Sequence, residues 1–166
     1  KSQGKNRGIV FCKTKTAVQK LVKQLQAKNI PADAIHGDLL QKERDKAMRA
    51  FKNETVQLLV ATDIAARGID IEGVSHVINF DIPDLPELYI HRIGRTGRAD
   101  KDGIAISFIT EKDEPLHDEI ETFIQKAVSI IPLPEDINIS DILTDDELPN
   151  TGTREIQIKR PKIDLT

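Results

Sequence analysis

The sequence predicts an α/β domain with a parallel sheet and helices on both faces of that sheet. Short apolar runs, typical of strands buried on both sides, alternate along the 166 residues with segments whose apolar residues recur at helical spacing. This alternation favours right-handed strand–helix–strand crossovers, which produce parallel strands. The chain is long enough to bury one compact core, and its 39% hydrophobic and 31% charged residues are ordinary for a globular protein.

The first half of the chain predicts three strands, with a helix after each. The strands are residues 8–12, 32–35 and 57–61. Thr14 can cap the first helix with its side-chain oxygen, and Pro31 stops the helical spacing of apolar residues behind it. The second helix is expected over residues 41–51, and the third is a short one that begins at Ile64 and ends at Gly68.

The second half predicts two more strands and two more helices. Residues 76–80 and 104–109 are the apolar runs, and between them Pro86 opens a helix that runs into a cluster of arginines. An amphipathic helix follows over residues 114–128, with His117 on its solvated face. Its inward-facing residues are expected to be Leu116, Ile120, Phe123, Ile124 and Ala127.

Charge and proline content divide the chain into a domain over residues 1–131 and an acidic linker with a basic C-terminal tail over 132–166. The net charge of −3 conceals this asymmetry, because residues 1–110 carry an excess of Lys and Arg while residues 111–149 are strongly acidic. Three prolines among these acids favour little regular structure, so the extension is expected to be partly ordered or disordered. Some apolar residues could still anchor it on the domain: Ile137, Ile139, Ile142 and Leu143. The stretch with Ile156, Ile158 and Ile163, interleaved with basic residues, could be either a strand or a disordered basic tail.

Cysteine and aromatic content limit the compartment and the mode of binding. Cys12 is the single cysteine and cannot form an internal disulfide, which indicates a reducing, intracellular and specifically cytoplasmic location. No apolar run approaches the length of a membrane span, so no membrane partner is expected. Aromatic residues make up 4% of the chain, which disfavours stacking of nucleic-acid bases. The chain begins at Lys1, which is expected of a piece cut from a longer protein.

Residues 91–98 gather three arginines, one histidine and two glycines. Arginine presents a planar fork of donors that fits phosphate oxygens, and glycine lets a phosphate approach the backbone. The sequence contains neither a Gly-x-x-x-x-Gly-Lys-Ser/Thr run nor a Gly-x-Gly-x-x-Gly run that would cradle phosphates. Arginines without a cradle indicate half of a composite site, where they act as fingers in phosphoryl transfer. The alternative is a solvated loop with salt bridges to nearby acids.

The other polar clusters follow predicted strands. They are residues 13–15, 36–38 and 62–70. Because ligands of parallel sheets bind at the carboxyl ends of the strands, we expect these clusters to share one rim with residues 91–98.

These clusters closely resemble motifs in the second RecA-like domain of DEAD-box ATP-dependent RNA helicases, which belong to superfamily 2. Residues 9–14 resemble motif IV, residues 36–38 with 41–44 motif IVa, residues 60–70 motif V, and residues 89–98 motif VI. The resemblance covers residues 7–134 and implies a RecA-like parallel-sheet domain with a C-terminal extension.

The resemblance implies a role for each motif when an N-terminal RecA-like domain of the same chain closes on this one around ATP and RNA. Arg95 and Arg98 correspond to the arginine fingers, and His91 to a residue that links to the catalytic motifs of the other domain. Arg92 would support the same interdomain contact, and Asp70 would bind the ribose hydroxyl of ATP. Contacts to RNA phosphates are implied for Thr14, Gly37, Arg44, Thr62, Arg67 and Gly68.

The implied cofactor is ATP with Mg²⁺, the metal being held mainly by the N-terminal domain. The implied partner is RNA, as a single strand or a duplex being opened. Phosphate contacts carry no base information, so binding is expected to be sequence-independent and salt-sensitive. The four histidines and one cysteine show no metal-ligand spacing, so no metal site is expected here. Because the motifs of the first domain are missing from the sequence, the fragment alone is expected to be inactive. It is also expected to be monomeric.

Two other functions stay open. A DNA-unwinding helicase of the same superfamily would share the fold and the arginine finger, although the residues of motifs V and VI disfavour it. A non-catalytic module that docks on RNA or on partners would have no need of Arg95, Arg98 and Asp70.

Overall fold

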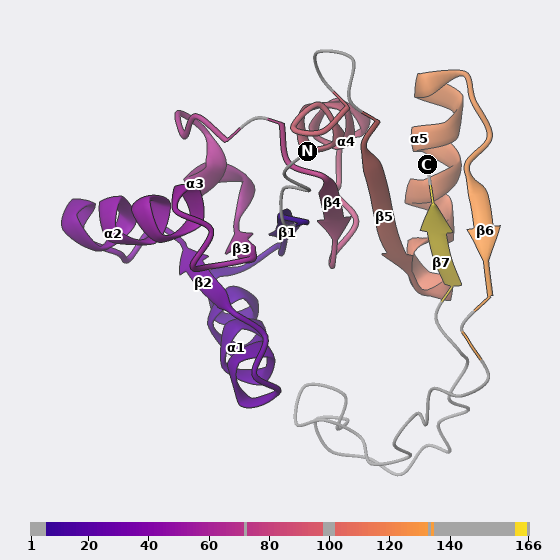
Figure 1. The fold of residues 1–166 in the computed structure, drawn as a ribbon. Helices are drawn as coiled ribbons and strands as arrows, with labels where there is room; N and C mark the ends of the chain where they lie inside the picture. Colours follow the sequence, from indigo (N-terminus) through magenta and orange to yellow (C-terminus); the bar gives the residue numbers. More distant parts are fainter. Residues whose placement is uncertain (1–5, 72, 98–101, 133, 135–161, 166) are drawn as a thin grey trace, which may run out of the picture.

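The computed structural model describes residues 6–71, 73–97, 102–132 and 134, together with the backbone of residues 162–165. Figure 1 shows one twisted sheet with helices packed against it. The strands are β1 (Gly8–Phe11), β2 (Ala32–Ile35), β3 (Leu58–Ala61), β4 (His76–Asn79), β5 (Ile104–Ile109), β6 (Ser129–Ile131) and β7 (Lys162–Leu165). The helices are α1 (Lys15–Ala27), α2 (Gln41–Lys52), α3 (Asp63–Ala66), α4 (Pro86–Ile93) and α5 (Glu114–Ile124), and a 3₁₀ turn, η1 (Glu111–Asp113), precedes α5.

The strand order is β2-β3-β1-β4-β5-β7-β6, and the first five strands are parallel. This confirms the predicted α/β class and the parallel sheet. The last two strands run antiparallel to their neighbours, with Ile109 opposite Lys162 and Ile131 opposite Ile163. The stretch around Ile163 is therefore a strand, which was one of the two alternatives for the C-terminal residues, whereas Ile156 and Ile158 lie outside the described residues.

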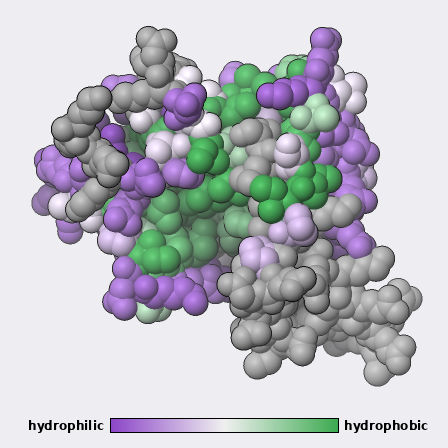
Figure 2. All heavy atoms as spheres, turned by 45° about the vertical axis from the view of Figure 1, so that its right-hand side comes forward, coloured by the Kyte–Doolittle hydropathy of each residue, from purple (hydrophilic) through white to green (hydrophobic). Residues whose placement is uncertain are grey.

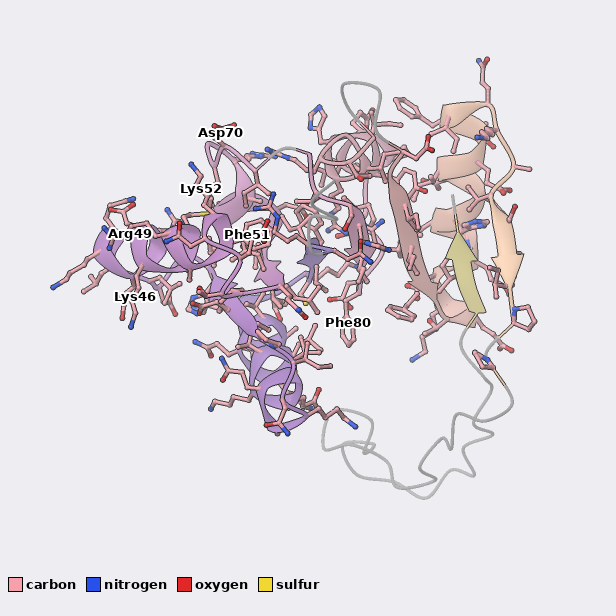
Figure 3. The ribbon with its side chains drawn as sticks, in the orientation of Figure 1. Lys46, Arg49, Phe51, Lys52, Asp70 and Phe80 are labelled. Carbon is pink, nitrogen blue, oxygen red and sulfur yellow. The ribbon has the colours of Figure 1, made fainter. Side chains whose placement is uncertain are left out.

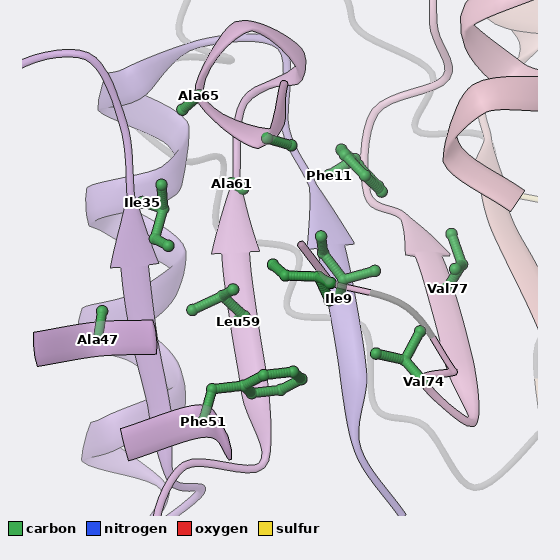
Figure 4. Packing of buried hydrophobic residues seen from close by; sticks show 12 residues of the cluster. Ile9, Phe11, Ile35, Ala47, Phe51, Leu59, Ala61, Ala65, Val74 and Val77 are labelled. Carbon is green, nitrogen blue, oxygen red and sulfur yellow. The ribbon is translucent and has the colours of Figure 1, made fainter. Parts of the chain in front are cut away.

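The core is divided between the two faces of the sheet. Ile9 and Phe11 of β1 point to one face, where they join Ala47 and Phe51 of α2 in a cluster that Figure 4 shows from close by. Alternate residues of the same strand point to the other face and pack against α1. Because successive side chains of a strand point to opposite sides, one apolar run can supply both layers. Helices on both faces are thus confirmed.

A further cluster joins α4 and α5 to the sheet. Tyr89 of α4, Ile120 of α5 and Ile109 of β5 are buried together there. On the other side of β4 and β5 the apolar residues are less covered, with Phe80 42% and Ile104 44% exposed. Figure 2 shows apolar side chains gathered on one face of the molecule. Phe80 is labelled in Figure 3. Within the part of the chain that the structure describes, the helical layer is therefore incomplete on this side.

The predicted helix over residues 114–128 is wrong at its C-terminal end. Helix α5 stops at Ile124, and Gln125 adopts a left-handed conformation with φ of 53°. Ala127 is consequently outside the helix and exposed, and Phe123 is 49% exposed rather than inward-facing. His117 is 9% exposed, contrary to the expectation of a solvated position. It lies three residues before Ile120 and so faces the same buried side.

Candidate nucleotide and RNA interface

The strand order places the predicted RNA contacts after three neighbouring strands. Gly37 follows β2, Thr62 follows β3 and Thr14 follows β1, and β2, β3 and β1 are adjacent in the sheet. The carboxyl ends of parallel strands lie at one edge, so these loops form a continuous rim. The topology therefore places these loops at one rim, as predicted.

Both threonines cap helices at this rim. The Thr14 side-chain oxygen accepts a hydrogen bond from the Ala17 backbone N–H at 3.1 Å, which confirms the predicted cap. The Thr62 side-chain oxygen accepts one from the Ala65 N–H at 3.3 Å. Because a hydroxyl that accepts still carries its own proton, each threonine can also donate to a phosphate oxygen. Capping and phosphate contact are therefore compatible in the same side chain.

The remaining predicted RNA contacts differ in exposure. Gly37, Arg67 and Gly68 are exposed, while Arg44 is half-buried. A Cβ atom on Gly37 would meet no other heavy atom within 4 Å, whereas Gly68 adopts φ of +76°, where side chains are strained. The Nε atom of Arg44 is buried without a hydrogen-bond partner among the described residues. Arg44 lies in the first turn of α2.

The predicted ribose-binding and phosphate-binding side chains are joined through the backbone. Asp70 is exposed, and Figure 3 shows it at the outer side of α3. The Arg95 guanidinium donates through Nη1 to the carbonyl oxygens of Ile69 at 3.1 Å and Ile71 at 3.5 Å, the residues on either side of Asp70. The position of the Asp70 backbone therefore depends on Arg95. Arg98 lies outside the described residues.

Arg92 is 1% exposed and forms the centre of a buried polar network. Its Nε and Nη2 atoms donate to the two carboxylate oxygens of Asp63 at 2.7 and 2.6 Å. Its Nη1 atom donates to Asn79 Oδ1 at 3.1 Å and to the Asp81 carbonyl oxygen at 2.7 Å, and the guanidinium lies 5.0 Å from the ring centre of Phe11.

This burial limits how Arg92 could support the interdomain contact that the resemblance implies. The guanidinium has no surface left for another domain, since it is already paired with acid and carbonyl oxygens inside this one. Any effect of Arg92 on an interface must pass through the residues that it positions. His91, by contrast, is exposed at the last turn of α4 and is free to contact a partner domain.

A cleft of about 420 Å³ lies between α3 and α4. Its lining brings together Arg67, His91 and Arg95, to which the resemblance assigns different roles, with Asp63 and the buried Arg92. Arginines from motifs V and VI therefore face one cavity at the rim. Asp63, the acid that lines this cleft, forms an ion pair with Arg92.

Electrostatic shifts mark the loops at the edge of the site. The Asp84 carboxylate beside Lys13, 2.7 Å from its Nζ atom, raises the pKa of that ammonium group. A hydrogen bond from Lys15 lowers the pKa of Asp38 in the same way. Burial raises the pKa of the Cys12 thiol to about 12, with the negative charge of Asp81 adding to the shift. Cys12 is therefore protonated at neutral pH and serves as a core residue.

One group of possible metal ligands lies away from this rim. His117, Asp118 and Glu121 place ligand atoms within 4.8 Å of one another on α5. Glu121 Oε1 already accepts a hydrogen bond from the Val128 N–H at 2.6 Å, and the Asp118 side chain is 80% exposed. We assign no metal to this group.

Sequence reasoning assigned no role to Asp63, Asn79 or Asp81, which are the partners of Arg92. A signal for Asn79 was present, because an amide inside the apolar run of β4 must find a partner when buried. Arg92 also lies three residues after Tyr89, on the helical face that Tyr89 buries.

Comparison with known proteins identifies the family. The model of the helicase conserved C-terminal domain matches residues 1–100. The DEAD-box ATP-dependent RNA helicase CshA of Bacillus subtilis is 50% identical over 119 residues, which cover 72% of this chain and 24% of that protein. The ATP-dependent RNA helicase eIF4A of Scheffersomyces stipitis is 45% identical over 126 residues, which cover 76% of this chain and 32% of that protein.

Solved structures give the same answer. A DEAD-box protein from the hyperthermophile Methanococcus jannaschii is similar with a TM-score of 0.70 and 44% identity, covering 74% of this chain and 34% of that chain. The E. coli DEAD-box protein SrmB, solved bound to the regulator of ribonuclease activity A, gives a TM-score of 0.71 at 35% identity, covering 91% of this chain and 82% of that chain.

The chain spans about a quarter to a third of the length of the curated relatives named here. No helix among the described residues is both long and apolar enough to span a membrane. Sequence family, fold and rim geometry agree, and the chain belongs to the helicase conserved C-terminal domain family as the C-terminal RecA-like domain of a DEAD-box RNA helicase.

Proposed function

We propose that this domain supplies one wall of an ATP site and one wall of an RNA site in an ATP-dependent RNA helicase, and that both sites are completed by an N-terminal RecA-like domain. The observation that carries the proposal is the pair of hydrogen bonds from Arg95 to the carbonyl oxygens on either side of Asp70. These hydrogen bonds fix the position of a cation suited to a phosphate relative to a carboxylate suited to a ribose hydroxyl.

Arg95 and Arg98 would act on the terminal phosphate of ATP, where positive charge stabilises the transition state. An arginine finger of this kind contributes roughly 1,000- to 100,000-fold to the rate of phosphoryl transfer. His91 stands exposed at the end of α4, where a closing domain could reach it. The present residues fit the ribose and the phosphate. They do not fit Mg²⁺, because the acid of the cleft, Asp63, already neutralises Arg92, so metal ligands would come from the other domain.

The RNA wall would consist of the threonine hydroxyls and exposed arginine at the rim. Thr14, Thr62 and Arg67 offer donors to phosphate oxygens and do not read bases, which favours sequence-independent binding of a single strand. Closure driven by ATP would tighten this grip and open a short duplex locally, and hydrolysis would release the strand. The reducing, intracellular location is supported by the buried, unpaired Cys12.

Calorimetry with ATP on this domain alone tests the composite site. We expect no binding at micromolar ATP, because half of the phosphate and metal contacts are missing, and no hydrolysis. Micromolar affinity would contradict the proposal. A strand-separation assay on the full-length helicase tests the substrate, and faster opening of an all-DNA duplex than of an RNA duplex would contradict the RNA assignment.

A further inference from the structure

Asp81 lies between the two walls of the rim. It follows β4, the strand beside β1, and two of its oxygens accept hydrogen bonds from different elements, a loop and a helix. One carboxylate oxygen accepts a hydrogen bond from the Lys13 backbone N–H at 2.8 Å, directly before Thr14. Its carbonyl oxygen accepts one from Arg92 at 2.7 Å, in the helix that carries His91 and leads into Arg95.

We propose that Asp81 is a positioning residue that couples the Thr14 loop to the arginine helix α4. The inference rests on the proposed function, because it needs Thr14 to contact RNA and Arg95 to act on ATP. It goes beyond that function by naming a path between the two sites that touches neither ligand.

The loop at Lys13 depends on the segment that Asp81 begins. The backbone N–H of Lys13 is held by Asp81, and the Lys13 ammonium pairs with Asp84 three residues further on. Thr14 next caps α1 through its side-chain oxygen, so its hydroxyl direction follows from where Lys13 is placed. A displacement of Asp81 would therefore move the donor that Thr14 offers to a phosphate.

The other end of the path is rigid. Arg92 is buried at 1% exposure and holds Asp81, Asn79 and Asp63 at the same time. Asp63 directly follows Thr62, so the same guanidinium also fixes the second threonine of the RNA wall. A buried guanidinium cannot exchange its hydrogen-bond partners for water, so a small displacement of one partner also displaces the others. RNA contact at both threonines is thus linked to the helix that leads into the finger Arg95.

The experiment compares Asp81→Ala with Asp84→Ala and Thr14→Val in the full-length helicase. Asp81→Ala loses the hydrogen bond to the Lys13 N–H, while Asp84→Ala removes only the exposed ion pair to the Lys13 side chain. We expect Asp81→Ala to raise the RNA concentration for half-maximal stimulation of ATP hydrolysis by about tenfold, the effect of one charge-assisted hydrogen bond. The KM for ATP without RNA should change less than about twofold, and Asp84→Ala should change neither quantity by more than that.

Two further variants test the coupling independently. Asp81→Asn retains an oxygen acceptor for the Lys13 N–H and should keep most of the RNA response, so a tenfold loss in Asp81→Asn would contradict the proposal even if Asp81→Ala does not fold. Asp81→Ala combined with Thr14→Val should be little worse than Thr14→Val alone, because both act on one contact. Fully additive effects, or an unchanged RNA response in Asp81→Ala, would overturn the coupling. If Thr14→Val itself leaves the RNA response unchanged, the proposed RNA wall is what fails.

Discussion

Removing Asp63 should strongly destabilise the domain, because Arg92 would be left as a buried and unpaired charge. Both carboxylate oxygens of Asp63 accept hydrogen bonds from Arg92 at 2.6 and 2.7 Å, and the Arg92 side chain is 1% exposed. Breaking a buried pair by deleting one partner costs about 3–5 kcal/mol. Since a domain of this size is stable by about 5–15 kcal/mol in total, Asp63→Ala would consume a large fraction of the free energy of unfolding.

Urea denaturation followed by circular dichroism on this chain measures the effect. With a slope of about 1–3 kcal/mol per molar urea, the midpoint of Asp63→Ala should fall by at least about 1 M. Arg67→Ala is the matched control, because Arg67 follows the same helix and is exposed, so its substitution should change stability by about 0.5 kcal/mol or less. A loss below about 1 kcal/mol for Asp63→Ala, or equal losses for the two variants, would refute the account of Arg92 as a buried structural residue.

Gly103→Ala should displace the turn that follows Arg95, because an added Cβ would overlap the Thr96 side chain and the Gly97 backbone nitrogen. ATP hydrolysis by the full-length helicase should therefore become slower. The control Gly8→Ala, at the amino end of the sheet, should affect stability alone, and equal hydrolysis rates for the two variants would contradict this prediction. Cys12, with its pKa raised to about 12, should react with a thiol reagent at pH 8 only after unfolding. Because the folded thiol holds its proton more tightly than the unfolded thiol, the free energy of unfolding should fall as the pH rises from about 9 toward about 12. Cys12→Val should lack that part of the fall, and an identical pH profile would contradict the assignment.

The arrangement of the rim was predictable because it follows from topology. Once residues 8–12 and 57–61 are recognised as buried parallel strands, the loops after them must lie at the same edge. Thr14 could even be identified as a cap from its position before the helical apolar spacing. The motif resemblance added roles to residues that the topology had already brought together.

The burial of Arg92 could not be predicted, because its hydrogen-bond partners come from two segments distant from it in the sequence. Asp63 is 29 residues away from Arg92 in the sequence, and Asn79 is 13 residues away. A charged residue next to other arginines suggests exposure unless its counter-ion is known, and that counter-ion is brought to it only by the folded sheet. The early end of α5 is a second failure of this kind, since the apolar spacing continues past Ile124 while the backbone turns at Gln125.

We propose that the arginines of the cleft between α3 and α4 serve two different ligands, ATP and RNA. The most direct test measures ATP hydrolysis and single-strand RNA affinity for Arg95→Ala and Arg67→Ala in the full-length helicase. Arg95→Ala should lower kcat by about a thousandfold and leave RNA affinity within about twofold. Arg67→Ala should weaken RNA binding and reduce its salt dependence, while the KM for ATP without RNA stays close to that of the wild type. If both substitutions weakened RNA binding equally and neither slowed hydrolysis at saturating RNA, the cleft would be a plain basic patch and the account would be contradicted.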